Sequence, residues 1–371
     1  MNNIEKELIE VCRHFNIGGE FHSYKIFTDG HINTTYLAEF VERGKFRKFL
    51  VQGINVHVFK NPKELMENIV GVTDYLRGKI SASGGNPKRE TLTFLQADNG
   101  KYYFYHLGKC WRIYHFIDHS YTINKIEQPI IFERAGKSFG LFQKHLDGYP
   151  MDTLHETIKD FHNTPKRIEA LEKSVELDTA GRASFVREEI DFVLSRKNDA
   201  EIIINLHKEG LIPLRVTHND TKLNNILFDE KTGDSICVID LDTIMPGFSL
   251  YDFGDSIRFG ANTTREDDDN LENVNVSLEL FEAFTRGFLS ACAKDLTEAE
   301  VRHLAFSAKL MTFECGVRFL TDYLDGDVYF KTAYQEHNLV RARNQFKLVS
   351  EIENNLTAMN EIVDRIYKEY I

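Results

Sequence analysis

The sequence predicts an α+β fold with two lobes, a small antiparallel β lobe followed by a larger, mostly helical lobe. The first third of the chain alternates apolar and polar residues with a period of two, whereas the pattern from Gln128 onward repeats about every 3.6 residues. The length of 371 residues is also sufficient for two separate cores. We therefore expect lobes at 1–117 and 128–371, joined by a polar hinge over 118–127.

The amino-terminal lobe is expected to start with an acidic amphipathic helix and to continue as a sheet with one embedded helix over 62–77. Its apolar segments are rich in Phe, Tyr and Val and are separated by polar turns, which is typical of antiparallel strands. The predicted strands are 21–27, 35–40, 46–54, 91–95, 102–107 and 111–116.

The carboxy-terminal lobe is helical except for one strand, loop, strand, turn, strand segment over 214–239. Thr297-Glu-Ala-Glu300 has the spacing of a capping box at a helix start. The predicted helices are 130–146, 166–177, 185–194, 201–209, 276–293, 297–324 and 339–368.

Composition narrows the class of protein. A net charge of −12 without a basic stripe argues against nucleic-acid binding. Five scattered cysteines without a Cys-x-x-Cys pair indicate reduced interior thiols. Neither a signal sequence nor an apolar run long enough for a membrane span is evident, so we expect a cytoplasmic protein without a membrane partner. The sequence carries no signal for an oligomeric state.

The segment with the clearest chemistry reads His218-x-Asp220-x-Lys222-x-x-Asn225, in the loop between the first two strands of the interrupting segment. It combines a general base, a cation and an amide ligand at short spacing. In the catalytic loop of protein kinases, an Asp accepts the proton of the attacking hydroxyl and a following Asn holds Mg²⁺. The pattern therefore predicts phosphoryl transfer, with Asp220 and Lys222 as catalytic residues and Asn225 as a metal ligand.

A second metal ligand is expected at Asp240, which ends the third strand of this segment 20 residues after Asp220. A literal Asp-Phe-Gly motif begins at Asp252, but it lies 32 residues after the base, beyond another turn. We therefore assign Asp240 to the metal and Asp252 to structure, as a helix N-cap. Asp242 is either a supporting acid or an additional ligand.

The loop over 28–35 connects the first two predicted strands and is a candidate phosphate-binding loop. Backbone amides at a glycine-containing turn, together with small polar side chains, can hold nucleotide phosphates. Gly30, Asn33, Thr34 and Thr35 are the residues expected to do so, in a cleft beside the hinge. His31 either caps the loop or faces the substrate.

The order of these motifs resembles the aminoglycoside phosphotransferase and choline kinase-like family, over most of the chain. Among its members, the sequence is most similar to N-acetylhexosamine 1-kinases. The segments that carry this similarity are 29–36, 217–225, 238–242 and 251–255.

The resemblance implies a protein-kinase-like fold with ATP and Mg²⁺ as cofactors. It implies transfer of the γ-phosphoryl group of ATP to the anomeric hydroxyl of N-acetylglucosamine or N-acetylgalactosamine. Asp220 is then the base, Asn225 and Asp240 hold Mg²⁺, and Lys222 offsets charge on the transferred group. His218 orients the loop by hydrogen bonding.

One residue departs from the wider kinase pattern. Gln52 ends the third strand where many relatives carry a lysine that pairs with the α- and β-phosphates. Another cation or Mg²⁺ alone must then balance those phosphates, or activity has been lost. Because the residues of the chemical step are present, we favour an active enzyme in which Gln52 contacts the nucleotide.

Arg318 and Tyr329 are the candidate sugar-binding residues, because an arginine and an aromatic ring suit sugar hydroxyls and an apolar ring face. The alternative is that the aromatic residues here pack the core and Arg318 pairs with an acid. Trp111 and Phe116, near the hinge, either pack around adenine or belong to the core.

Two other functions fit the same motifs. The first is a kinase of the same fold that phosphorylates choline, methylthioribose, a homoserine-like alcohol or an aminoglycoside. The second is a nucleotide-binding pseudokinase, for which Gln52 is the main support. The choice between N-acetylglucosamine and N-acetylgalactosamine depends on one hydroxyl and stays open.

Overall fold

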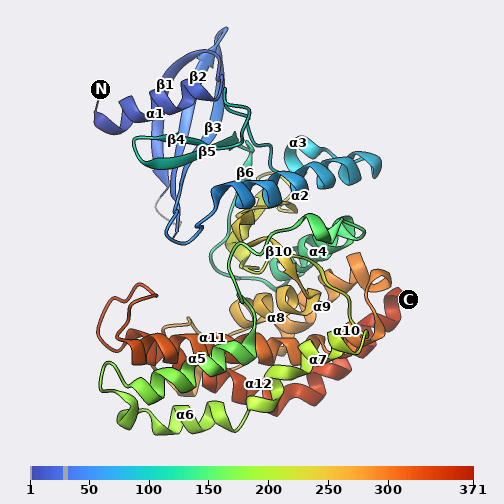
Figure 1. The fold of residues 1–371 in the computed structure, drawn as a ribbon. Coiled ribbons are helices and arrows are strands. Elements are labelled where there is room, and N and C mark those ends of the chain that lie inside the picture. The colour runs from blue at the N-terminus through green and yellow to red at the C-terminus, as the bar shows by residue number, and fades with distance from the viewer. Residues whose placement is uncertain (1, 28–31) are drawn as a thin grey trace. The chain divides into compact units, whose positions relative to one another are not determined.

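The structure, a computed structural model, describes residues 2–27 and 32–371 and divides into two compact units (Figure 1). Unit 1 comprises Met1–Tyr121, Gly148–Lys159 and Leu227–Met245; unit 2 comprises Thr122–Asp147, Asp160–Ile226 and Pro246–Ile371. Each unit is therefore assembled from three separate stretches of chain. The contiguous lobes expected at 1–117 and 128–371, with a hinge at 118–127, stay a prediction.

Unit 1 is built on a five-stranded antiparallel sheet with the strand order β1-β2-β3-β5-β4. Its apolar face packs against helix α1 (Asn3–His14) and contains Phe49, Val51 and Trp111, so Trp111 belongs to the core. The predicted strand at 91–95 is wrong, because only an isolated bridge from Phe94 to Tyr114 forms there. The strands are β1 (Glu20–Phe27), β2 (Thr34–Glu42), β3 (Lys45–Ile54), β4 (Phe104–His106) and β5 (Lys109–His115).

The long helix of unit 1 is α2, which starts where the sequence predicts and continues to Ala82. Asn61 caps it by accepting the Glu64 N–H, and Pro62 occupies the first turn, where its missing donor costs no hydrogen bond. The remaining elements of this unit are α3 (Pro87–Glu90), β6 (Ser120–Tyr121), β8 (Ile226–Asp229), β9 (Ser235–Val238) and the short 3₁₀ helices η1 (Met151–Thr153) and η5 (Leu241–Thr243).

Unit 2 is helical, as the change of periodicity predicts, and its core contains side chains from α5, α6, α11 and α12. Together with the sheet of unit 1, it confirms the α+β fold class. Its helices are α4 (Pro129–Leu146), α5 (Thr164–Leu177), α6 (Arg187–Leu194), α7 (Ile202–Lys208), α8 (Ser249–Gly260), α9 (Leu278–Cys292), α10 (Glu298–Arg302), α11 (Leu304–Asp325) and α12 (His337–Tyr370). Strand β7 (Arg215–Thr217) and the 3₁₀ helix η4 (Leu223–Asn225) flank the predicted catalytic loop, and β10 (Met245–Gly247) precedes α8.

Two helix boundaries in unit 2 differ from those expected. The helix predicted at 297–324 is two helices separated at His303, although the capping box of Thr297 and Glu300 forms as predicted. Helix α8 begins at Ser249, so Asp252 is inside its first turn and is not its N-cap. The side chain of Asp252 is therefore available for another partner.

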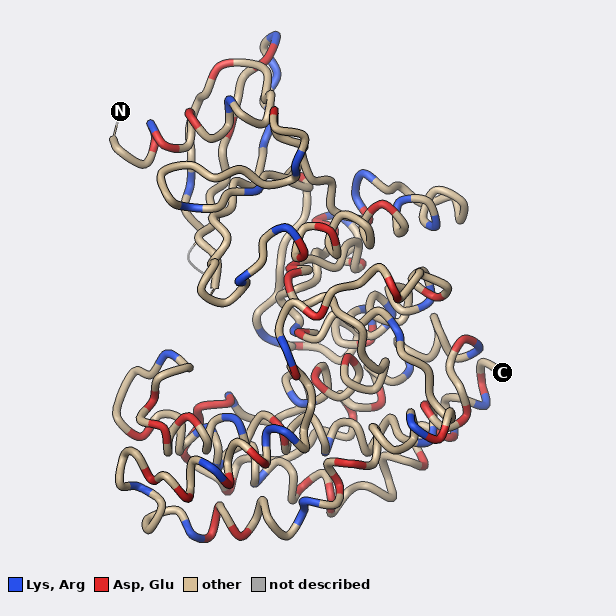
Figure 2. Tube along the Cα trace, viewed as in Figure 1, with Lys and Arg blue, Asp and Glu red and all other residues tan. Residues whose placement is uncertain are grey.

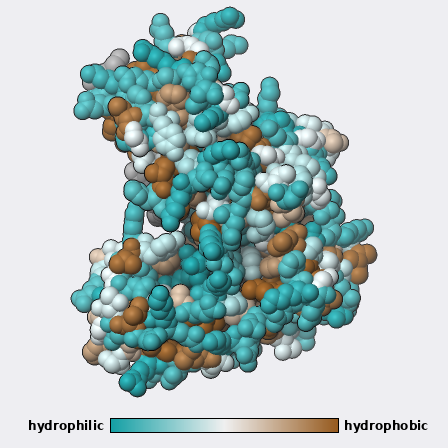
Figure 3. All heavy atoms as spheres, viewed as in Figure 1, coloured by the Kyte–Doolittle hydropathy of each residue, from teal (hydrophilic) through white to brown (hydrophobic). Residues whose placement is uncertain are grey.

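Charged and apolar residues have no unusual distribution over the surface. Figure 2 shows acidic and basic residues interspersed along the chain, and the face drawn in Figure 3 is mostly hydrophilic. In the described part of the chain, no helix has both the length and the apolar character needed to cross a bilayer.

The five cysteines are free thiols, and burial raises the pKa of Cys110 to about 11. Cys315 alone is half-buried rather than interior.

Helices α4 and α9 approach each other closely because glycines lie at their contact. A Cβ atom on Gly287 would lie 1.9 Å from the carbonyl oxygen of Glu133, and one on Gly136 would lie 2.3 Å from that of Phe284. Backbone atoms cannot move aside as the end of a flexible side chain can. These glycines therefore set the spacing of the two helices.

We predict that Gly287→Ala lowers the free energy of unfolding by about 1–3 kcal/mol, because the methyl group forces α9 away from α4. Gly78→Ala is the matched control: Gly78 is exposed in α2 and has open space around it, so alanine should raise stability by about 0.5–1 kcal/mol. Thermal or denaturant unfolding measures both. Equal effects of the two substitutions would contradict the proposed helix spacing.

Candidate active site

The predicted catalytic loop brings Asp220, Lys222 and Asn225 together. The Nζ atom of Lys222 lies 2.8 Å from Oδ1 of Asp220, and Nδ2 of Asn225 donates to the Asp220 carbonyl oxygen at 2.8 Å and to its Oδ2 at 3.2 Å. The Asp220 side chain is 29% exposed, so a small molecule can reach the carboxylate. Sequence spacing alone implied proximity of these residues, and the structure gives each one a defined contact.

The Asp220–Lys222 pair is charged near neutral pH. Burial, the largest single effect, raises the pKa of Asp220, but the ammonium group of Lys222, together with His218 and Arg258, holds the pKa below its ordinary value. The Asp220 carboxylate in turn raises the pKa of Lys222. Asp220 is therefore an ionised acceptor, and Lys222 is a cation beside it.

Helix α8 holds the predicted catalytic loop through Asp252. Its Oδ2 accepts the backbone N–H of His218 at 2.9 Å, and its Oδ1 accepts that of Asn219 at 2.8 Å. Gln143 from α4 donates to the same carboxylate at 2.8 Å, and the hydroxyl of Thr221 donates to the Asp252 carbonyl oxygen at 2.6 Å. Asp252 is 1% exposed, so these bonds replace its lost hydration and fix the loop.

The other two residues of the literal Asp-Phe-Gly motif also have structural roles. Phe253 is fully buried and packs against Phe284 and Phe288 of α9. Gly254 lies against α11, where a Cβ atom would be 2.3 Å from the carbonyl oxygen of Ser307. The Asp-Phe-Gly motif is thus part of the buried helix α8 and holds the loop in position.

A second carboxylate of α8 extends this support. Asp255 accepts the backbone N–H of Thr221 at 3.1 Å, and Arg258, one turn further along the helix, donates to Asp255 at 2.9 Å. The hydroxyl of Ser256 donates to the Thr221 carbonyl oxygen at 3.1 Å. The residue after the candidate base is thus held through both its backbone N–H and its carbonyl group.

His218 is fully buried beside the loop that it was expected to orient. Its Nδ1 accepts the backbone N–H of Asp220 at 3.3 Å, and its ring lies edge-on to Phe139 and Phe142. Asn219, the residue between His218 and the base, has a φ of 64°, a left-handed conformation that Asn tolerates better than most residues. The backbone therefore turns sharply immediately before Asp220.

His162 and Glu314 also contact this loop, although no sequence motif singled them out. The Nε2 atom of His162 lies 3.1 Å from the carbonyl oxygen of Asn219, and its Nδ1 lies 2.7 Å from Oε1 of Glu314. Thr164 donates to the other carboxylate oxygen of Glu314 at 2.7 Å. Burial, the largest single effect, raises the pKa of Glu314, but His162, Arg318 and Thr164 together hold it below its ordinary value.

The predicted sugar-binding residues lie in the same unit. The guanidinium carbon of Arg318 is 5.4 Å from the ring centroid of Phe161, 5.9 Å from that of Tyr329 and 5.5 Å from that of Phe330. Tyr329 is 64% exposed. Within 2–27 and 32–371, Arg318 forms neither a hydrogen bond nor an ion pair, although its charge helps to lower the pKa of Glu314. In line with the alternative of a packed core, Phe319 and Tyr323 are buried in the core and Phe330 packs against it.

Arg167 is a further member of this cluster that the sequence did not indicate. It donates to the Phe161 carbonyl oxygen at 2.7 Å, while its buried Nε has no hydrogen-bond acceptor in the described structure. Burial, and next the charge of Arg318, lower the pKa of Arg167. Two guanidinium groups therefore lie near each other in unit 2, close to residues that hold the catalytic loop.

Several predicted nucleotide-binding residues form a network in unit 1. Asn33 donates to Asp242 at 2.5 Å, and Gln52 donates to the Thr35 hydroxyl at 2.9 Å. Thr34 is exposed at the start of β2. Gly30 and His31 lie outside the described residues.

Arg112 links the two halves of this network. It donates to Oε1 of Gln52 through Nε at 2.8 Å and through Nη2 at 2.6 Å. It also forms an ion pair with Asp242. Arg112, Gln52 and Asp242 are all buried, so this pair is well shielded from solvent. No sequence motif indicated that Arg112 would join the phosphate-binding candidates.

The chemistry of Asn225 and Asp240 suits Mg²⁺, which binds through one or two carboxylates together with other oxygen atoms. The amide nitrogen of Asn225 donates hydrogen bonds to Asp220, which leaves the amide oxygen of Asn225 for a ligand. Asp240, in unit 1, is exposed and has a φ of 58°, a costly conformation of the kind found at functional sites. Within the described residues, no three His, Cys, Asp or Glu side chains cluster as a metal site, so protein carboxylates alone would not complete one.

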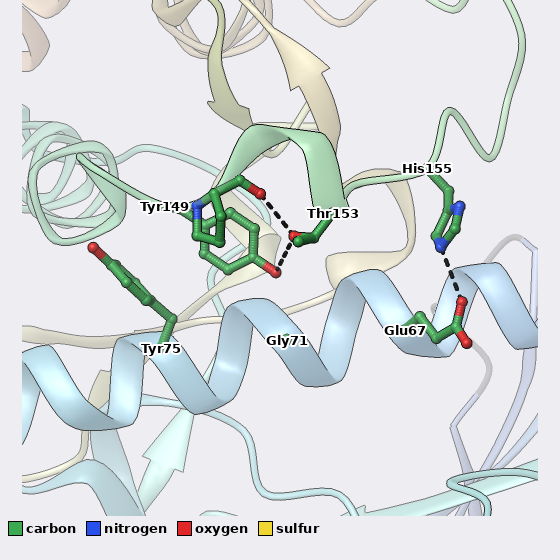
Figure 4. A pocket seen from close by; sticks show the side chains of 7 residues that line it. Glu67, Gly71, Tyr75, Tyr149, Thr153 and His155 are labelled. Atoms are coloured by element: carbon green, nitrogen blue, oxygen red, sulfur yellow. Dashed lines mark hydrogen bonds and ion pairs between the residues drawn. The ribbon is translucent and has the colours of Figure 1, made fainter.

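A separate groove of about 530 Å³ lies along α2 in unit 1 (Figure 4). Tyr149 and Thr153 face Gly71 on one side, and His155 pairs with Glu67 at 2.9 Å on the other. Its lining contains none of the predicted site residues.

The sequence matches the model of the phosphotransferase enzyme family over residues 24–276. Three similar solved structures are an aminoglycoside phosphotransferase from Alicyclobacillus acidocaldarius (11% identity, 96% of each chain, TM-score 0.62), a choline kinase from Cryptosporidium parvum (16% identity, 98% of this chain and 99% of the other, TM-score 0.57) and a spectinomycin phosphotransferase in complex with ADP and spectinomycin (15% identity, 94% and 96%, TM-score 0.57). At these identities the structures establish a shared kinase-like fold. The match extends over more than half of the sequence, and the chain therefore belongs to the phosphotransferase enzyme family as a small-molecule phosphotransferase.

Proposed function

We propose that this protein transfers the γ-phosphoryl group of ATP to the anomeric hydroxyl of an N-acetylhexosamine, N-acetylglucosamine or N-acetylgalactosamine, with Asp220 as the base. The ionised Asp220 carboxylate, held by Lys222 and Asn225 on a fixed loop, is the observation that carries the proposal. The spectinomycin phosphotransferase of similar fold was crystallised with ADP, which supports a nucleotide donor.

Asp220 aligns the acceptor hydroxyl and takes its proton as the oxygen bonds to the γ-phosphorus and the bond to ADP breaks. Lys222 lies close enough to Asp220 to offset negative charge on the transferred phosphoryl oxygens. Asn225 and Asp240 would hold Mg²⁺, which would neutralise phosphate charge when bound. The fixed backbone on both sides of Asp220 keeps the carboxylate oriented throughout.

Arg318 and Tyr329 support a sugar acceptor. The Arg318 guanidinium group, which forms no hydrogen bond or ion pair within the described residues, can donate to an acetamido oxygen or to hydroxyls, while the exposed Tyr329 ring can cover the apolar face of a pyranose. His31 stays a predicted substrate contact.

The two neighbouring arginines also weigh against a cationic acceptor. Choline and aminoglycosides carry positive charge, and like charges at close range are unfavourable in a partly buried site. Arg167 and Arg318 therefore favour a neutral or anionic acceptor over an amino alcohol or an aminoglycoside. The pseudokinase alternative rests on Gln52, whereas the intact Asp220 constellation favours turnover.

We predict that Asp220→Asn lowers kcat by roughly 10²–10⁴-fold, because the amide cannot accept the proton of the acceptor. ATP affinity, measured by calorimetry, should change less than about twofold. Asp269→Asn, in an exposed acidic segment, is the matched control and should keep full activity. An Asp220→Asn variant with wild-type kcat would remove Asp220 from the role of base.

We predict that the acid limb of the kcat/KM profile assigned to Asp220 lies below about pH 4, since Lys222 lowers the pKa of that carboxyl from an ordinary value near 4. Lys222→Met removes the stabilising cation, so the pKa of Asp220 rises and the limb moves to higher pH. Lys231→Met, at an exposed turn, should leave the limb in place. A limb that stays fixed in Lys222→Met would contradict the coupling.

We predict that the enzyme forms an acid-labile sugar 1-phosphate from an N-acetylhexosamine and that Arg318→Gln raises KM for the sugar about tenfold or more, with KM for ATP unchanged. The exposed Arg302→Gln is the control. Product analysis across N-acetylhexosamines, hexoses, amino alcohols and an aminoglycoside tests the acceptor. Phosphorylation of the amino alcohols alone would defeat the sugar assignment and leave the enzyme class intact.

A further inference from the structure

Gln52 and Arg112 are directly opposite each other on neighbouring strands. The register of β3 and β5 pairs Gln52 with Arg112, and it pairs the preceding Val51 with Ile113. Val51 and Ile113 belong to the apolar core on one face of the sheet. Because side chains alternate between faces, Gln52 and Arg112 share the other face. A cation on β5 therefore lies beside the position where the lysine is missing from β3.

The contacts of Arg112 hold its guanidinium group in one orientation. The Nε and Nη2 atoms share Oε1 of Gln52, and Nη1 bonds to Asp242 and lies 3.9 Å from the sulfur of Met66. These contacts use four of the five N–H groups of an arginine. The remaining N–H, on Nη2, has no acceptor among the described residues. It is available to a ligand.

The candidate phosphate-binding loop is joined to the same network at two points. Thr35 accepts the amide N–H of Gln52, and Asn33 donates to Asp242 while accepting the backbone N–H of Asn55 at 2.9 Å. The loop is thus tied to the Gln52 amide on one side and to the partner of Arg112 on the other. The positive charge of Arg112 acts strongly on groups close to this network, because Arg112 is only 2% exposed and solvent screens it little.

We propose that Arg112 replaces the missing strand lysine as the cation that faces the nucleotide phosphates, and that Gln52 is the positioning residue that orients it. This inference rests on the proposed use of ATP. A lysine at position 52 would direct its own ammonium group at the phosphates, whereas the neutral amide accepts two N–H groups of Arg112 and aims the guanidinium from the next strand. The replacement of the strand lysine by Gln52 then means that the positive charge has moved to the next strand, and not that activity has been lost.

The main competing role for Arg112 is to neutralise Asp242 and no more. The test uses ADP and adenosine as probes in calorimetric titrations, since both contain the base and ribose but only ADP contains phosphates. Arg112→Gln alone leaves Asp242 buried and unpaired, so the informative variant is Arg112→Gln with Asp242→Asn, which removes both charges. We expect its ADP affinity to fall about tenfold or more while adenosine affinity stays within about twofold of wild type.

A second variant returns the cation to β3. Gln52→Lys with Arg112→Gln should recover most of the ADP affinity that Arg112→Gln/Asp242→Asn loses, because an ammonium group again lies on this face of the sheet. Gln52→Lys alone places two cations side by side and should bind ADP more weakly than the wild type. Circular dichroism and unfolding midpoints verify that each variant is folded.

The outcomes distinguish the proposed role of Arg112 from the proposed use of ATP. Equal losses of ADP and adenosine affinity in Arg112→Gln/Asp242→Asn, or no loss of either, would overturn the role of Arg112 while leaving ATP use intact. Failure of the wild-type protein to bind ADP would instead defeat the proposed nucleotide donor itself.

Discussion

The buried carboxyl group of Asp252 is the constraint on which the predicted catalytic loop depends. Burial raises the pKa of this carboxyl group. A polar group that is 1% exposed must have hydrogen-bond partners in place of water, and the donors here are the backbone N–H groups of His218 and Asn219 and the side chain of Gln143. These bonds connect helices α8 and α4 to the two residues that precede the candidate base. The helical core therefore determines the position of Asp220.

Charge placement follows from this rigid support. Asp220 is ionised because Lys222 lies beside it, and Asn225 contacts both the backbone and the carboxylate of the same residue. Arg167 and Arg318 carry two further positive charges in the helical unit, and Arg112 carries one within the sheet unit. Such a distribution is suited to negatively charged phosphoryl groups and to neutral or anionic acceptors.

The sequence was informative wherever the signal was local. The alternating pattern predicted β1, β2 and β3 to within about two residues, and the spacing from Asp220 to Asn225 predicted residues that touch. Distance along the chain correctly favoured a structural role for Asp252, but its place as an N-cap was wrong because α8 starts three residues earlier. The strand expected at 91–95 does not form for a related reason: β propensity is present there, but the segment pairs with β5 only around one isolated bridge, from Phe94 to Tyr114.

By itself, the sequence determined the α+β class, the order of the main elements and the contacts within the predicted catalytic loop, because each depends on neighbours a few positions apart. Only the tertiary structure assigned His162, Arg167 and Arg112 to their clusters. His162 meets Glu314 across 152 positions, and Arg112 meets Gln52 across 60 through strand register. Contacts of this kind depend on packing and pairing between distant segments, and a side chain that acts through them leaves no pattern near its own position in the chain.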